Sequence, residues 1–264
     1  MRLRLTESSI EIATAINDFS RVYHDDFFEV RPTARRWIAE KSPTEATSGE
    51  LVRLVRRVLG SWGAGKREAP RLSSGDDFAE ALLHAQLHRS VGRLSEISNT
   101  ALGFDVDRRR LVNGLHVSSD LKDFDENLLS VLREISRRLF VNNTNITYPL
   151  KVLLLISGLM PALDSQVRRG LGHAGFSGVN RTQFLLPIDT TSADAKKLTR
   201  LPFVLGQCWS DFATQFADGI RRSNFASLLQ EPARVFDILL FMQADKEIPL
   251  LTLQSGSERW YDLA

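Results

Sequence analysis

The 264-residue sequence contains a single cysteine, Cys208. One cysteine cannot form an intramolecular disulfide, which is typical of a protein kept in a reducing compartment, and we therefore expect a cytoplasmic protein. Because Cys208 stands beside Trp209 in an apolar run, we expect a small buried side chain and not a nucleophile.

Long apolar segments are also missing. No run of about 18 uncharged apolar residues occurs, so the sequence predicts no membrane span and no membrane partner. The N-terminal residues Met-Arg-Leu-Arg-Leu-Thr-Glu lack the apolar centre of a secretory signal peptide.

The motifs of nucleotide-binding proteins and serine hydrolases are incomplete or absent. Residues 60–67, Gly-Ser-Trp-Gly-Ala-Gly-Lys-Arg, nearly match the phosphate-binding loop G-x-x-x-x-G-K-[ST]. Arg67, however, replaces the hydroxyl residue that would hold Mg²⁺, and the residues after it do not favour a helix. No G-x-S-x-G motif occurs. The glycine, serine, proline and charge of residues 60–75 instead predict a mobile loop.

Three metal-ligand residue types recur with helical spacing. Glu80, His84 and His88 lie four residues apart, which would place them on one helix face, and two histidines so spaced can bind a metal. Ala85 nevertheless stands where the H-E-x-x-H motif has its glutamate, and no cysteine or second histidine pair completes a site. We therefore expect hydrogen-bonded histidines, and neither a metal nor another cofactor.

Composition indicates a globular protein with clustered arginines. The apolar content of 43% and the charged content of 25% are ordinary, and a net charge of +2 allows nucleic-acid binding without requiring it. Such clusters indicate either solvated helix faces or a surface that follows phosphates. They are Arg35-Arg36, Arg56-Arg57, Arg108-Arg109-Arg110, Arg137-Arg138, Arg168-Arg169 and Arg221-Arg222.

Apolar residues recur with helical spacing along most of the chain, and no internal repeat or sustained strand alternation is present. The sequence thus predicts a mainly α, multi-helix globular protein with few or no strands. We expect one domain over residues 1–264, with two lobes and the mobile loop at 60–75. The clearest predicted helices span residues 123–140, 149–158, 164–171 and 231–243.

Two prolines are expected to mark helix boundaries. Pro32 should begin a short helix, since its missing N–H costs least in the first turn. Pro202 should interrupt a helix and precede a long one at residues 204–220.

The most apolar segment runs from residue 148 to residue 172. Pro149 suits the first turn of a helix, and the apolar residues around Lys151 predict that this helix is buried on nearly every side. Gly158 should end it, and Asp164 then occupies a favoured N-cap position of a basic second helix. The segment therefore predicts a buried helix, a tight turn and a second helix.

Part of this segment resembles a known family. The run Asp164-Ser-Gln-Val-Arg-Arg is similar to the segment after the hairpin of helix-hairpin-helix DNA glycosylases, where an aspartate begins an Asp-[Thr/Ser]-x-Val-x-Arg run. Lys151 stands in a place comparable to that of a lysine in the bifunctional members. Residues 234–241, Arg-Val-Phe-Asp-Ile-Leu-Leu-Phe, are similar to a later helix of some relatives. Of the family's Leu-Pro-Gly-x-Gly hairpin, only Ser157-Gly158-Leu159 remains.

The resemblance implies a glycosylase-like helical fold and a base-excising function on DNA, or an inactive relative. Asp164 would stabilise the developing sugar cation or prepare the attacking group, and Lys151 would be the amine nucleophile. The target base would be extruded into a pocket between two helical lobes. We expect positively charged side chains to contact the DNA phosphates. The candidate residues are Arg168, Arg169, Lys196, Lys197 and Arg200.

Two other interpretations stay open. Asp164 can serve only as a helix cap, with Lys151 paired to it as an internal ion pair. The chain can also be a non-catalytic helical module that binds another protein. Arginine pairs that line one groove beside Asp164 favour DNA binding, whereas pairs scattered around the molecule weaken that interpretation.

Overall fold

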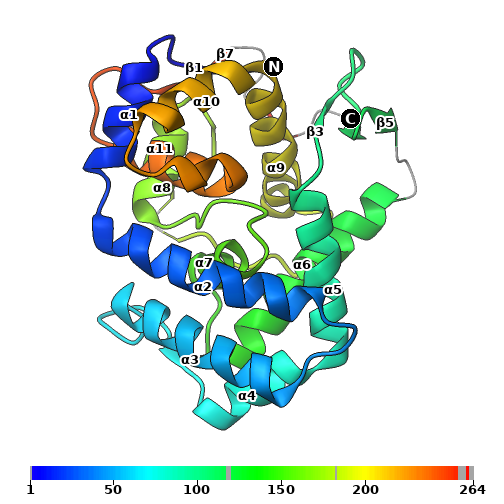
Figure 1. Cartoon of the computed structure of the whole chain (residues 1–264). Coiled ribbons are helices and arrows are strands. Elements are labelled where there is room, and N and C mark those ends of the chain that lie inside the picture. The colour runs from blue at the N-terminus through cyan, green and yellow to red at the C-terminus, as the bar shows by residue number, and fades with distance from the viewer. Residues whose placement is uncertain (1, 117–119, 182, 255–259, 262–264) are drawn as a thin grey trace.

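The computed structural model describes residues 2–116, 120–181, 183–254 and 260–261, and helices dominate these residues (Figure 1). The predicted mainly α class is confirmed. The helices are α1 Ser9–Asp18, α2 Arg21–Ala39, α3 Glu45–Ser61, α4 Gly75–Leu83, α5 Ala85–Ser98, α6 Asp120–Leu139, α7 Thr147–Ile156, α8 Ser165–His173, α9 Ala193–Asp211, α10 Ala213–Arg222, the short 3-10 helix η1 Ala226–Gln230 and α11 Pro232–Gln243. None of these described helices is long and apolar enough to cross a bilayer.

Local sequence signals explain where several helices begin. A side-chain oxygen at the N-cap accepts a hydrogen bond from an amide of the first turn, which satisfies a donor that the helix itself leaves unpaired. The N-caps that act in this way are Ser8, Thr44, Ser74, Asp164 and Ser192. The four helices with the clearest apolar pattern are present as α6, α7, α8 and α11, within a few residues of the predicted bounds.

The expectations for the prolines and for the histidine face are wrong. Pro32 and Pro202 lie inside α2 and α9, and the helix predicted at residues 204–220 is divided at Phe212. Burial of apolar residues on both sides of Pro202 outweighs the hydrogen bond that the proline removes. His84 separates α4 from α5 with extended backbone angles, so Glu80, His84 and His88 do not share one helix face.

Short antiparallel strands connect distant parts of the chain. β1 (Arg2–Leu5) pairs with β7 (Leu251–Gln254), and β2 (Arg71–Leu72) pairs with β6 (Phe140–Val141). A third sheet has the order β3 (Leu102–Phe104), β4 (Arg110–Val112) and β5 (Leu115–His116). Strand β2 lies inside residues 60–75, which were predicted to be only a mobile loop. The sequence did not indicate this strand because its partner β6 is 70 residues away and gives no local signal.

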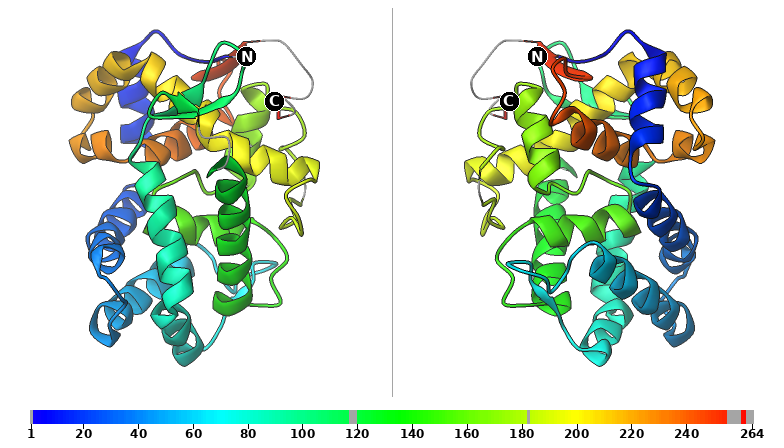
Figure 2. Two further views of the ribbon diagram at one scale, coloured as in Figure 1. Left: turned by 90° about the vertical axis from the view of Figure 1, so that its right-hand side faces the viewer. Right: turned by 90° about the vertical axis from the view of Figure 1, so that its left-hand side faces the viewer.

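The helices form two groups joined through α2 and α7 (Figure 1). One group contains α1 and α8 to α11, and the other contains α3 to α6. Figure 2 shows α5 and α6 side by side, in agreement with their contacts. One continuous apolar core runs through both groups. Helix α7 lies within it, and its residues Leu150 and Val152 to Ile156 are all buried, as its apolar sequence predicts.

A buried arginine fixes the end of α7. The Arg31 guanidinium of α2 donates to the carbonyl oxygens of Leu155 and Ile156, which the helix leaves without intrahelical partners. Arg31 also forms an ion pair with Glu231, at 2.8 Å between Nε and Oε1. Three elements, α2, α7 and α11, therefore meet at one buried cation.

Helices α8 and α11 approach each other closely at Gly170. A Cβ atom on Gly170 would lie 1.8 Å from the carbonyl oxygen of Leu240, so only glycine allows this contact. The contact sets the position of α8, and hence of its N-cap Asp164, relative to α11.

We predict that Gly170→Ala lowers the free energy of unfolding by about 3 kcal/mol or more, since two helix backbones must separate. Urea unfolding measures this loss. Gly92→Ala is the matched control within α5, where a Cβ meets nothing within 4 Å. Alanine there raises the free energy of unfolding by up to about 1 kcal/mol. Equal effects of the two substitutions would contradict the proposed helix contact.

Candidate functional site

Lys151 and Asp164 lie in the wall of the same pocket. Helix α7 contributes Lys151, the N-cap of α8 contributes Asp164, and α11 contributes two further charged residues. The cavity has a volume of about 50 Å³, room for a few water molecules. Its lining consists of Phe19, Tyr23, Trp62, Lys151, Ala162, Asp164, Arg234, Asp237 and Phe241.

The Lys151 ammonium is half-buried and has no carboxylate partner in direct contact among the described residues. Its Nζ atom donates to the carbonyl oxygen of Trp62 at 3.3 Å and lies 4.8 Å from the ring centre of Tyr148. Burial lowers the pKa of Lys151. The negative charges of Asp164 and Asp237 oppose this shift, and the positive charge of Arg234 adds to it. A larger fraction of Lys151 is thus neutral, and able to act as a nucleophile, than of an ordinary lysine.

Asp164 is a helix cap with one oxygen to spare. Its Oδ1 atom accepts a hydrogen bond from the amide of Val167 at 3.0 Å, which confirms the predicted N-cap. Its Oδ2 atom accepts no hydrogen bond from the part of the chain that the structure describes. Because Asp164 is half-buried at the pocket wall, this oxygen remains available to a bound group.

The predicted ion pair between Lys151 and Asp164 is absent, since Lys151 donates to a backbone carbonyl instead. Both side chains nevertheless line one pocket, as expected if they converge. The turn between α7 and α8 holds them near each other without direct contact, leaving an amine and a carboxylate that face a shared space.

A buried ion pair on α11 borders the pocket. Arg234 Nη1 lies 2.5 Å from Asp237 Oδ2, and Arg234 Nη2 donates to the carbonyl oxygen of Tyr23 at 2.8 Å. The other Asp237 oxygen accepts from the amide of Ala162 at 2.9 Å. Burial lowers the pKa of Arg234 and raises that of Asp237, while their mutual attraction opposes both shifts. The pair therefore joins α11 to α2 and to the turn before Asp164.

Aromatic rings form much of the remaining wall. Tyr23 meets Trp62 edge-on at 5.7 Å between ring centres, and Phe19 meets Phe241 edge-on at 5.3 Å. Tyr148 donates from its hydroxyl to the carbonyl oxygen of Trp62, and burial raises the pKa of Tyr148 to about 12. Aromatic faces beside fixed polar groups are suited to a flat ring with a polar edge.

Sequence patterns alone did not identify Arg234, Asp237, Trp62 or Tyr23 as pocket residues. One pattern could have indicated the first two: Arg234 and Asp237 lie three residues apart in an otherwise apolar helix. Charged residues on a buried helix face must be paired with each other or serve a function. Trp62 had no such signal, because its backbone carbonyl and its ring reach the pocket only through the packing of the helices.

The predicted phosphate contacts need correction at two positions. Lys197, a predicted phosphate contact, is only 2% exposed and forms an ion pair with Asp194. Arg168 is 5% exposed and donates to the carbonyl oxygen of Arg181. Both side chains satisfy structural partners of the core, so neither presents its charge to a phosphate.

The other three predicted phosphate contacts remain predictions. Arg169 lies at the surface, where it pairs with Asp245. Lys196 is exposed and Arg200 is half-buried, both on α9.

The arginine clusters do not line one groove beside Asp164. They lie on α2, α3, the β3–β4 connection, α6, α8 and α10. Most are paired locally with carboxylates, as Arg36 is with Glu50, Arg57 with Glu29 and Arg221 with Asp218. This distribution is typical of solvated helix faces and weakens a DNA-binding role for the clusters themselves.

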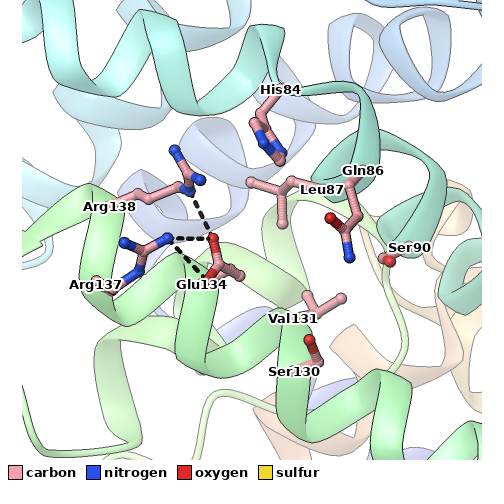
Figure 3. Close-up of a pocket in the computed structure, with 9 residues that line it drawn as sticks. All are labelled: His84, Gln86, Leu87, Ser90, Ser130, Val131, Glu134, Arg137 and Arg138. Carbon is pink, nitrogen blue, oxygen red and sulfur yellow. Dashed lines mark hydrogen bonds and ion pairs between the residues drawn. The ribbon is translucent and has the colours of Figure 1, made fainter.

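A second pocket, between α5 and α6, has a volume of about 230 Å³ (Figure 3). Glu134 turns toward both Arg137 and Arg138, with which it forms ion pairs, and His84 enters from the opposite side. Both arginines are already bound to Glu134, so their charges are partly neutralised within the pocket. The pocket at Lys151 is the better candidate site.

Comparison with protein-family models, with curated proteins and with solved structures gives no match. Function is therefore inferred from the pocket itself.

His24 of α2 lies just behind the aromatic wall and is fully buried. Its ring stacks on Phe225 at 3.8 Å, and its Nε2 atom lies 3.0 Å from the carbonyl oxygen of Ile16. Burial is the main cause that lowers the pKa of His24 to about 4.

We predict that the protein loses stability as pH falls from about 6.5 to about 4. In this range the unfolded chain binds a proton at His24 while the folded chain does not, so acid favours unfolding. The loss is on the order of 3 kcal/mol. Urea unfolding at several pH values measures it, and His24→Gln should remove most of this pH dependence. An unchanged pH dependence in the variant would contradict the assignment to His24.

Proposed function

We propose that the protein is a DNA glycosylase-like, base-excising protein with Lys151 and Asp164 as its catalytic residues. The observation that carries the proposal is the shared pocket, in which an amine without a carboxylate partner faces an aspartate with a free oxygen. A purely structural pair would be enclosed and in direct contact, whereas these two groups are apart and half-buried.

The proposed chemistry uses the two groups in turn. The neutral Lys151 amine attacks C1′ of the deoxyribose, and the bond from C1′ to the base breaks, with its electron pair leaving on the base. The Asp164 carboxylate stabilises the positive charge that develops on the sugar. The attached nitrogen, now cationic, loses one proton. Its electron pair then breaks the bond from C1′ to O4′, which leaves an iminium ion on Lys151 while O4′ takes up a proton. The departing base takes up a proton from solvent.

The pocket walls support a nucleobase as the bound group. Aromatic rings of Phe19, Tyr23 and Trp62 supply apolar faces, and Arg234 with Asp237 supplies polar groups. Enzymes that act on bases extrude the target nucleotide and hold it between apolar side chains while polar groups read its edge. The small cavity volume implies that wall side chains turn aside when a base enters.

Phosphate contacts are proposed for the turn that follows Trp62. Lys66 and Arg67 are exposed there and form no ion pair with another described residue. The turn borders the site, since a Cβ on Gly63 would lie 3.4 Å from the Tyr148 hydroxyl. These two cations follow the wall residue Trp62 by four and five positions.

A non-catalytic module that binds another protein is the second candidate function. The observation that favours it is the local neutralisation of most arginine pairs, which leaves little positive surface for DNA. The two candidates differ in what they require of Lys151.

We predict that the protein releases a base from duplex DNA carrying assorted damaged bases, and that borohydride traps a covalent adduct on Lys151. Lys151→Met should abolish the adduct while changing the free energy of unfolding by less than about 1 kcal/mol. Asp164→Asn should lower base release by about 100-fold or more. Lys41→Met, at an exposed lysine just beyond the end of α2, is the control and should keep full activity.

The opposite outcome identifies a structural role. In that case no base is released, and Lys151→Met costs roughly 3 to 5 kcal/mol of stability because the Asp164 carboxylate is left in the pocket without the nearby positive charge of Lys151.

We further predict weak DNA binding that falls steeply with salt, since affinity must come from phosphate contacts. Replacing both Lys66 and Arg67 with Gln should weaken binding to any sequence and lower the slope of log K against log salt by about 2. Fluorescence anisotropy at several salt concentrations measures both. The control replaces Arg221 and Arg222 of α10 with Gln and should leave affinity unchanged. Equal losses in the two double variants would count against the turn as the DNA contact.

A further inference from the structure

The charged groups around Lys151 come from two other elements. Asp164 belongs to the N-terminus of α8, and Arg234 and Asp237 belong to α11. All of them line the pocket with Lys151. Two carboxylates are thus within the same small cavity as one amine, yet neither is in direct contact with it among the described interactions.

The reason lies in how the Asp237 carboxylate is occupied. One oxygen is bound by Arg234 at 2.5 Å, and the other accepts the amide of Ala162 at 2.9 Å. Each Asp237 oxygen thus already has a donor, and the Lys151 Nζ atom donates to the Trp62 carbonyl instead.

Arg234 is itself held firmly in place. Its guanidinium lies over the rings of Phe19 at 4.9 Å, Phe27 at 5.1 Å and Trp62 at 5.6 Å, and it donates to the carbonyl oxygen of Tyr23. Cation–ring contacts and a carbonyl acceptor fix its orientation from the side opposite Asp237. The arginine cannot turn away to release the carboxylate.

We infer that Arg234 is a positioning residue that keeps Asp237 from pairing with Lys151 and so leaves the Lys151 amine free to react. The inference rests on the proposed role of Lys151 as a nucleophile and names the group that makes the role possible. Arg234 acts in two ways: it occupies the competing carboxylate, and its own positive charge disfavours a second cation nearby.

The inference predicts opposite effects for the two members of the pair. Without Arg234, Asp237 attracts a proton to Lys151, so the amine becomes more basic. Without the negative charge of Asp237, the unopposed Arg234 makes the amine less basic. A role limited to supporting the fold predicts the same direction for both, since a loosened pocket admits water and returns Lys151 to ordinary basicity.

The test is competitive labelling of the native protein with acetic anhydride, which reacts only with neutral amines, followed by mass spectrometry of the Lys151 peptide. At neutral pH, Arg234→Met should lower labelling of Lys151 relative to exposed Lys41 by about tenfold. Asp237→Asn should raise it, and the double variant should fall between the two. Arg234→Lys keeps a charge and should stay within about twofold of the parent protein.

Changes in the same direction, or no change, overturn the inference. Melting temperatures identify any variant that does not fold. If Arg234→Met does not fold, the nearly isosteric Asp237→Asn provides the test, by whether labelling of Lys151 rises or falls. Labelling does not depend on DNA cleavage. A protein that shows the opposing shifts but releases no base therefore refutes the proposed function and leaves the charge arrangement intact.

Discussion

Two buried arginines hold α11 in place, and the pocket exists because of them. Arg31 joins the end of α7 to Glu231, and Arg234 joins α2 to Asp237, which in turn binds the amide of Ala162. Removing one partner of such a pair leaves an uncompensated buried charge, at a cost of about 3 to 5 kcal/mol. Helices α2, α7 and α11 are therefore held in one arrangement by Arg31 and Arg234.

Within that frame, the chemistry of the site depends on which charges are already satisfied. A buried carboxylate that already has two donors competes less strongly for a neighbouring amine than a free one does. Asp237 already has two donors, and Lys151 has only a carbonyl acceptor and aromatic neighbours. The same pocket would hold an inert ion pair if one arginine were absent.

The surface outside the pocket contributes little net field. Most arginine clusters stand beside carboxylates on their own or an adjacent helix, as in the pairs of Glu134 with Arg137 and Arg138. Exposed pairs of this kind add little to stability and screen each other at a distance. Any recognition of a polyanion thus depends on a few local contacts near the pocket and not on long-range attraction.

Local pattern in the sequence determined the helical class, the buried helix α7, the cap at Asp164 and the burial of Cys208, because periodicity and capping act over only a few residues. It also suggested that Lys151 and Asp164 converge, since a short turn joins their helices. Tertiary structure alone decided that Lys151 would bind the Trp62 carbonyl, 89 positions away in the sequence, and that Lys197 would be buried. Such contacts depend on how helices pack, and packing energy outweighs the local preferences that a sequence displays.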